Sequence, residues 1–196
     1  MAPTLHRFSE ILLATGLALA VSACPRAEVP AEAPAEVPAG KGNCGPGSML
    51  RVELHGSVTA SIDWQGPTLD CGGMPRPEGQ GARLQFGGSA DPADPERRLT
   101  FIIALPGLER GAPAAEIPAT VTLIEEERGR FYSSAELEIC WADVSLQMPD
   151  DSLGPNRYRI SGLVYCVAPL AEQNGTGGVS FTDLRYSGWL EWSSPQ

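Results

Sequence analysis

The sequence predicts an all-β domain with the architecture of a β-sandwich, and three observations support this prediction. Apolar residues or glycine occupy every even position from 50 to 64, and polar residues occupy every odd position, so the two sets fall on opposite faces of a strand. Short apolar runs recur further along the chain between turns that contain Gly or Pro. Helical periodicity is weak, although residues 108–116 have room for one helical turn. Such strands build a sandwich, Ig-like or similar, or a closed barrel, and we favour the sandwich.

The first half of the domain contains four predicted strand regions. The alternating run 50–64 forms a long first strand, in which Gly56 marks a bend or bulge where the strand curves or changes sheets. Residues 83–86 form a short alternating strand. Residues 99–105 are apolar on both faces, as in a central strand. Residues 120–124 are rich in β-branched side chains, which favour strands.

The second half of the domain continues the same pattern. Residues 131–141 alternate, and the parity of the apolar positions then changes over residues 144–148. This change predicts a bulge or turn near Ala142. Residues 158–166 again carry their apolar side chains at even positions, and residues 179–192 form the last strand region.

Four cysteines of this domain predict two disulfides. Residues paired in a hairpin have a constant sum of residue numbers, and a loop centred between residues 152 and 153 places Cys140 almost opposite Cys166. Cys44 is then left to pair with Cys71, in a bridge that stabilises the fold by about 3 kcal/mol. A zinc site is the alternative, but it favours closely spaced pairs such as C-x-x-C, whereas these cysteines are widely spaced.

The start of the chain has the features of an export signal. Arg7 precedes an apolar stretch that begins at Ile11, and this stretch is too short to cross a hydrocarbon layer of about 30 Å. It ends in Val21-Ser22-Ala23-Cys24, which resembles the lipobox of bacterial lipoproteins. The resemblance implies that residues 1–23 are a signal peptide and that Cys24 receives diacylglycerol and further acyl chains such as palmitate. An ordinary secretory signal cut near Ala23 and an uncleaved anchor are the alternatives.

Residues 24–43 contain the predicted lipidated cysteine and a disordered tether rich in Pro, Ala and Glu, and the all-β domain follows over residues 44–196. An extended tether of this length spans on the order of 50 Å. Pro25 stands where the lipoprotein sorting rule requires Asp for retention in the inner membrane. The resemblance therefore implies the outer membrane of a Gram-negative bacterium, with the domain facing the periplasm or the cell surface.

Catalytic motifs give no support for an enzyme. His55 is the one histidine beyond the signal peptide, and it lies on the polar face of the first strand. The sequence contains no Gly-x-Ser-x-Gly, His-Glu-x-x-His or P-loop motif. Asp91, Asp94 and Glu96 are weak candidates for a metal site, because the glycine and the terminal Glu of an EF-hand are missing. We predict a non-enzymatic protein without a metal or cofactor.

Aromatic residues and charge indicate the kind of partner. Trp189 and Trp192 lie on opposite faces of the last strand, so one of them is a candidate binding residue for a sugar ring or a protein. The net charge of −10 disfavours nucleic acid. We therefore expect a lipid-anchored envelope lipoprotein whose domain has a binding or structural role. An inhibitor of a cationic, lysozyme-like hydrolase and a carbohydrate-binding module are the alternatives.

Overall fold

The computed structural model describes residues 44–77, 80–134 and 138–192. The predicted signal peptide, Cys24 and the tether lie outside the described residues. All strand pairs in the described part are antiparallel, which confirms the predicted all-β fold. The strands are β1 (Met49–Gly56), β2 (Ala60–Gln65), β3 (Asp70–Pro75), β4 (Ala82–Asp91), β5 (Asp94–Leu105), β6 (Ala114–Pro118), β7 (Thr120–Glu125), β8 (Arg130–Ser133), β9 (Cys140–Pro149), β10 (Arg157–Cys166), β11 (Leu170–Glu172), β12 (Gly178–Ser180) and β13 (Leu184–Glu191). Two short 3-10 turns, η1 (Gly66–Thr68) and η2 (Asp151–Leu153), precede β3 and β10.

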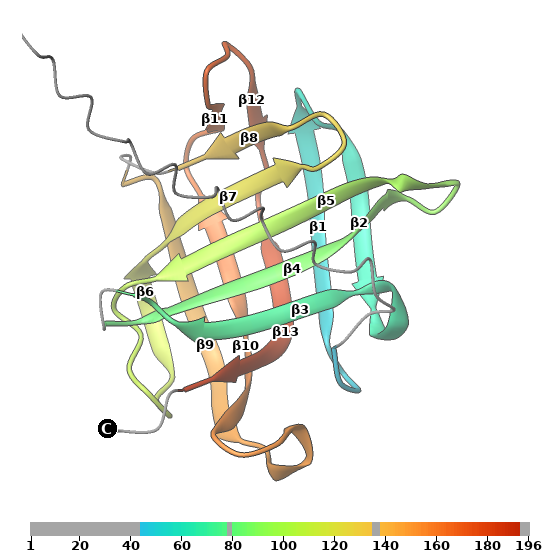
Figure 1. The fold of residues 1–196 in the computed structure, drawn as a ribbon. Helices are drawn as coiled ribbons and strands as arrows, with labels where there is room; N and C mark the ends of the chain where they lie inside the picture. Colours follow the sequence, from blue (N-terminus) through green and yellow to red (C-terminus); the bar gives the residue numbers. More distant parts are fainter. Residues whose placement is uncertain (1–43, 78–79, 135–137, 193–196) are drawn as a thin grey trace, which may run out of the picture. The chain divides into compact units, whose positions relative to one another are not determined.

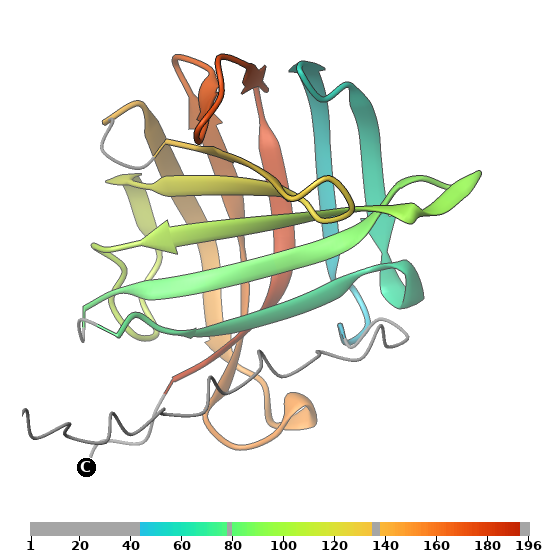
Figure 2. The same cartoon turned by 45° about the horizontal axis from the view of Figure 1, so that its top comes forward.

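The strands form two layers that share β1 (Figure 1). One layer has the order β2-β1-β13-β10-β9-β6, and the other runs β3-β4-β5-β7-β8-β11-β12 and continues onto the end of β1. The strands of the second layer cross those of the first in both views (Figures 1 and 2). The hydrogen-bonded path ends at β3 and at β6, so the sandwich is open.

The run predicted as one long strand is a hairpin, so that part of the prediction is wrong. Leu50 pairs with Trp64 and Leu54 pairs with Ala60, which makes β1 and β2 antiparallel neighbours. Even positions face even positions in this register, so the alternation of the sequence continues unbroken across the turn. Gly56 does mark the change of sheet, because it pairs with Val179 of the second layer and has a φ of 105°. A Cβ atom at Gly56 would overlap the Gly178 carbonyl.

Both layers send large side chains into one core. Trp64 packs edge-on against Phe101 at 6.1 Å between ring centroids, and its Nε1 donates to the Ser89 carbonyl at 2.6 Å. A Cβ at Gly88 would lie 2.7 Å from the Trp64 ring, so glycine is needed for this contact. The largest fully buried side chains are Tyr132, Tyr186, Phe86, Phe101, Leu50, Leu54, Leu69, Leu84, Leu99, Ile103, Leu105 and Leu123.

Three local predictions differ from the structure. The helical turn suggested for residues 108–116 is not formed; that stretch is a loop followed by the first residues of β6. The run 131–141 is divided, because β8 ends at Ser133 and β9 begins at Cys140. The register of β9 against β10 does shift, but the extra residue is Ser145 and not a residue near Ala142. The first two differences accompany strand pairings between separate segments, β6 with β9 and β8 with β11, which a local pattern does not contain.

Tyr186 carries a buried polar atom that no protein group satisfies within the described part of the chain. The side chain is 2% exposed, and its hydroxyl has no hydrogen-bond partner there. Burial raises the pKa of Tyr186, and the Asp143 carboxylate raises it further. A raised pKa means that the native state binds the proton more tightly than the unfolded state. The unfolding free energy therefore does not depend on this proton below pH ~10. Above pH ~10 the unfolded chain releases the proton more readily than the native state does, so the unfolding free energy falls as the pH rises.

We predict that Tyr186→Phe leaves the unfolding free energy at pH 7 unchanged or raises it by up to about 1 kcal/mol, because it removes an unsatisfied buried hydroxyl. We also expect alkaline unfolding to begin at a higher pH in the variant. Urea unfolding at pH 7 and at several pH values above 10 would measure both effects. A loss of more than 1 kcal/mol at pH 7 would contradict the prediction.

Candidate functional site

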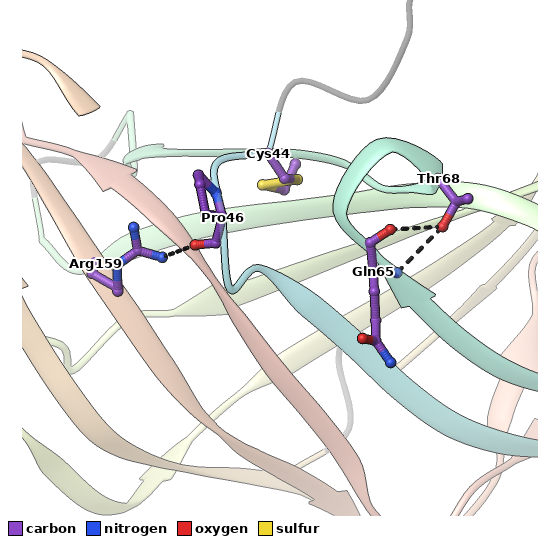
Figure 3. Close-up of a disulfide and its surroundings, with 6 residues drawn as sticks. Cys44, Pro46, Gln65, Thr68 and Arg159 are labelled. Carbon is purple, nitrogen blue, oxygen red and sulfur yellow. Dashed lines mark hydrogen bonds between the residues drawn. A yellow bond between two sulfur atoms is a disulfide. The ribbon is translucent and has the colours of Figure 1, made fainter. Parts of the chain in front are cut away.

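The chain enters the domain at a point that is tied down twice. The Cys44–Cys71 disulfide joins the first described residue to β3, as predicted. Arg159 of β10 donates from Nη1 to the Pro46 carbonyl at 2.8 Å (Figure 3) and pairs with Asp150 at 2.9 Å. The predicted tether therefore joins the domain at a cross-linked point, which we call the entry end.

A recess of about 400 Å³ lies beside the entry end. Gln65 and Thr68 close the adjoining turn reciprocally, because the Gln65 N–H donates to Thr68 Oγ1 at 3.3 Å and Oγ1 donates to the Gln65 carbonyl at 3.0 Å (Figure 3). The charged side chain of the recess, Arg51, is neutralised by Asp63 at 2.9 Å. The lining residues are Gly47, Ser48, Met49, Arg51, Gln65, Gly66 and Pro67. This set brings no aromatic ring to the recess, so we place the candidate site elsewhere.

The second disulfide holds together the other end of the β9–β10 hairpin. Cys140 lies directly opposite Cys166 in the register, and the two are bonded, as the hairpin numbering predicted. Trp141 and Tyr165 are the next opposed pair, and they lie on the outer face of the layer. Their rings stack with centroids 6.0 Å apart and planes 25° apart, and both side chains are partly exposed. Val167, just beyond β10, is 71% exposed.

Two carboxylates lie beside this aromatic pair. Asp143 follows Trp141 on the same face of β9, and its Oδ1 accepts from the Glu116 N–H at 2.8 Å. Glu116 lies in a bulge of β6 with a φ of 53°, which is uncommon for a residue other than glycine. Partial burial raises the pKa of Tyr165, and the charges of Glu116 and Asp143 raise it further. We call Glu116, Trp141, Asp143, Tyr165 and Val167 the Trp141 surface.

A small recess of about 170 Å³ adjoins the Trp141 surface. Trp141 forms part of its wall, and the exposed Glu138 adds a third carboxylate. The remaining lining residues are Pro106, Pro118, Ala119, Thr120 and Cys140. The surface thus combines exposed apolar and aromatic groups, a shallow hollow and an acidic rim, which together resemble the make-up of a protein interface.

The Trp141 surface and the entry end are at opposite ends of β10. Arg159 contacts the entry end, and Tyr165 lies further along the same strand at a distance of about 20 Å. Strands β6, β9 and β10, which carry the surface, are neighbours in the layer shown behind the crossing strands (Figure 2).

The two predicted candidate tryptophans have different environments. Trp192 is 8% exposed and donates from Nε1 to Gln147 Oε1 at 2.6 Å, so it belongs to the core. Trp189 is partly exposed, and the Arg157 guanidinium lies over its ring at 4.3 Å. Sequence reasoning missed Trp141, although the register that pairs the second disulfide also places Trp141 opposite Tyr165.

The other candidates for chemistry are separate from this surface. Asp91 and Asp94 face each other in the β4–β5 turn, where Asp91 Oδ1 accepts from the Ala93 N–H at 2.8 Å, and Glu96 follows in β5. Among the described residues, no three His, Cys, Asp or Glu side chains converge as metal ligands would. His55 is exposed on β1 opposite Ser180.

The part of the chain that the structure describes contains no helix with the length and apolar character needed to span a membrane. No protein-family model, no curated protein and no solved structure matches this chain.

Proposed function

We propose that the protein is a lipid-anchored lipoprotein of the cell envelope, whose β-sandwich is a non-enzymatic binding module. In this proposal Cys24 carries the lipid and the tether acts as a spacer. The Trp141 surface contacts the partner. The outer membrane of a Gram-negative bacterium is the proposed location, on the basis of the lipobox-like sequence and Pro25.

The observation that carries this proposal is the separation of the two ends of β10. In this proposal the tether attaches at Cys44, so the entry end is the part of the domain that connects along the chain to the lipid anchor. The Trp141 surface is about 20 Å further along the strand, so it stays accessible to a partner. The tether, which can extend on the order of 50 Å, would let the domain contact partners at that distance from the membrane.

The chemistry of the Trp141 surface favours binding over catalysis. Exposed Trp and Tyr side chains are enriched among the residues that dominate binding energy. The carboxylates of Glu116 and Asp143 lie near a tyrosine hydroxyl whose pKa is raised, so the phenol stays neutral at physiological pH. His55, the histidine of the domain, belongs to β1 and not to the three strands of the surface.

We predict that Cys24→Ser abolishes membrane attachment when the full-length precursor is expressed in a Gram-negative bacterium. The wild-type protein should sediment with outer membranes and be released by detergent but not by high salt, because at least two acyl chains give stable anchoring. The variant should appear in the soluble fraction. Ser22→Ala is the matched control, because it changes the same segment and retains the cysteine. A Cys24→Ser protein that still sediments with membranes would overturn the proposed anchor.

A further inference from the structure

We infer that the Trp141 surface binds a cationic protein, whose lysine or arginine side chains contact the aromatic pair and the neighbouring carboxylates. This inference rests on the proposed binding function and specifies the chemistry of the partner. Three features of the described residues support it: unneutralised carboxylates, uncovered aromatic rings and an exposed apolar group at the edge of the same surface.

The carboxylates of the Trp141 surface differ from three other acids of this layer and its loops, whose charges are neutralised. Asp63, Asp150 and Glu191 each pair with an arginine at 2.9 Å. Glu116 and Asp143 form no ion pair with any described Lys or Arg. Their negative charges are therefore available to a cation from another molecule.

The aromatic pair differs from other rings in the same way. Arginine side chains lie over Trp189 at 4.3 Å, over Tyr158 at 5.3 Å and over Tyr132 at 5.7 Å. The rings of Trp141 and Tyr165 stack on each other, and no described cation lies over either ring. Trp and Tyr rings attract Lys and Arg, and the attraction grows when the contact is desolvated.

The extent and charge of the surface favour a protein as the occupant. Its residues come from β6, β9 and the end of β10, which is a wider span than one small cation covers. Val167 is 71% exposed and supplies apolar area of the kind found at the centre of protein interfaces. The net charge of −10 attracts a basic protein over a distance and repels polyanions such as nucleic acids.

Two unrelated small basic proteins, lysozyme and cytochrome c, are suitable probes. Each would be tested in its native form and after succinylation of its lysines, which reverses charge on the same protein. The detergent-solubilised full-length lipoprotein would be immobilised, and binding would be measured at 50 mM and 300 mM salt. We expect at least one native probe to bind, no binding of the succinylated form, and at least tenfold weaker binding at high salt, because screening shortens the range of charge attraction.

Substitutions locate the binding site. We expect Trp141→Ala and the double variant Glu116→Gln/Asp143→Asn each to weaken binding at least tenfold; Asn retains an acceptor for the Glu116 N–H. Phe131→Ala removes a 44% exposed aromatic ring from β8, and Glu127→Gln removes one exposed acid from the β7–β8 turn. These two controls should bind like the wild type.

The outcomes separate this inference from the function it rests on. Trp141-dependent binding of neutral chitin oligosaccharides, unaffected by salt and by the double variant, would overturn the cationic partner and support a binding module. Absence of Trp141-dependent binding to lysozyme, to cytochrome c and to the chitin oligosaccharides would overturn both proposals. Loss of binding in the Phe131 or Glu127 control as well would place the contact elsewhere and overturn the inference.

Discussion

Gly162→Ala is expected to lower the unfolding free energy by about 3 kcal/mol or more, because the new methyl group has no space. A Cβ at Gly162 would overlap the Asp143 carbonyl and lie 2.7 Å from the Tyr186 hydroxyl. The carbonyl belongs to the neighbouring strand β9, so it cannot move without displacing the β9–β10 ladder, and Tyr186 is buried, so its ring cannot move without disturbing the core. Overpacking usually costs 1–3 kcal/mol, and a clash with backbone lies at or above the top of that range.

Gly107→Ala is the matched control for this change. A Cβ at Gly107 would lie 3.8 Å from the Ile117 side chain, which is an ordinary contact. Its unfolding free energy should stay within about 1 kcal/mol of the wild type. Urea unfolding of the two variants would test the comparison, and equal midpoints would show that β10 adapts at Gly162. Because Gly162 touches Asp143, the same clash should also weaken binding at the Trp141 surface.

Arg130→Met should destabilise the domain by about 2–4 kcal/mol, because it leaves a buried carboxylate without its main partner. Glu125 is 1% exposed, and its Oε2 accepts from Arg130 Nε at 2.9 Å and from Nη2 at 2.6 Å. Methionine retains the aliphatic volume and removes the charge. Arg128, at 3.3 Å from Oε1, still offers partial compensation, and Arg130 is itself 31% exposed. For both reasons we expect Arg130→Met to lower the unfolding free energy by less than a fully unpaired buried charge would.

The surface pair Arg51–Asp63 provides the control for the buried pair. Its side chains are 53% and 54% exposed, so Arg51→Met should change the unfolding free energy by no more than about 1 kcal/mol. Adding Glu125→Gln to Arg130→Met should restore part of the loss, because it removes the unpaired charge. If Arg130→Met and Arg51→Met lower the unfolding free energy equally in urea, the buried Glu125 carboxylate does not need Arg130 as a partner.

The predictions that succeeded depend on local register. One hairpin loop was enough to place Cys140 opposite Cys166, and the remaining pair followed by elimination. The alternation over residues 50–64 identified the buried face correctly, but it could not distinguish one strand from a hairpin, because both preserve the parity of buried positions.

Other features of the fold depend on contacts between distant segments, which a local sequence pattern does not reveal. Gly72-Gly73 has the composition of a turn, yet both residues lie in β3. A Cβ at Gly73 would lie 2.5 Å from the Trp189 carbonyl, so glycine serves here for close packing of β3 against β13. Trp141 faces outward because its neighbours Cys140 and Ala142 are buried, and the apolar alternation over residues 131–141 did not identify which of its two faces is buried.

The Cys44–Cys71 bridge also determines how the domain responds to a pulling force. Force transmitted along an anchored tether first reaches Cys44, and the covalent bond passes it directly to β3. Without the bridge, the same force would act on the start of β1 and separate its hydrogen bonds with β2 and β13 one after another. The domain should therefore resist mechanical unzipping by a force applied through Cys44, while β3, at one end of the pairing path, bears the load.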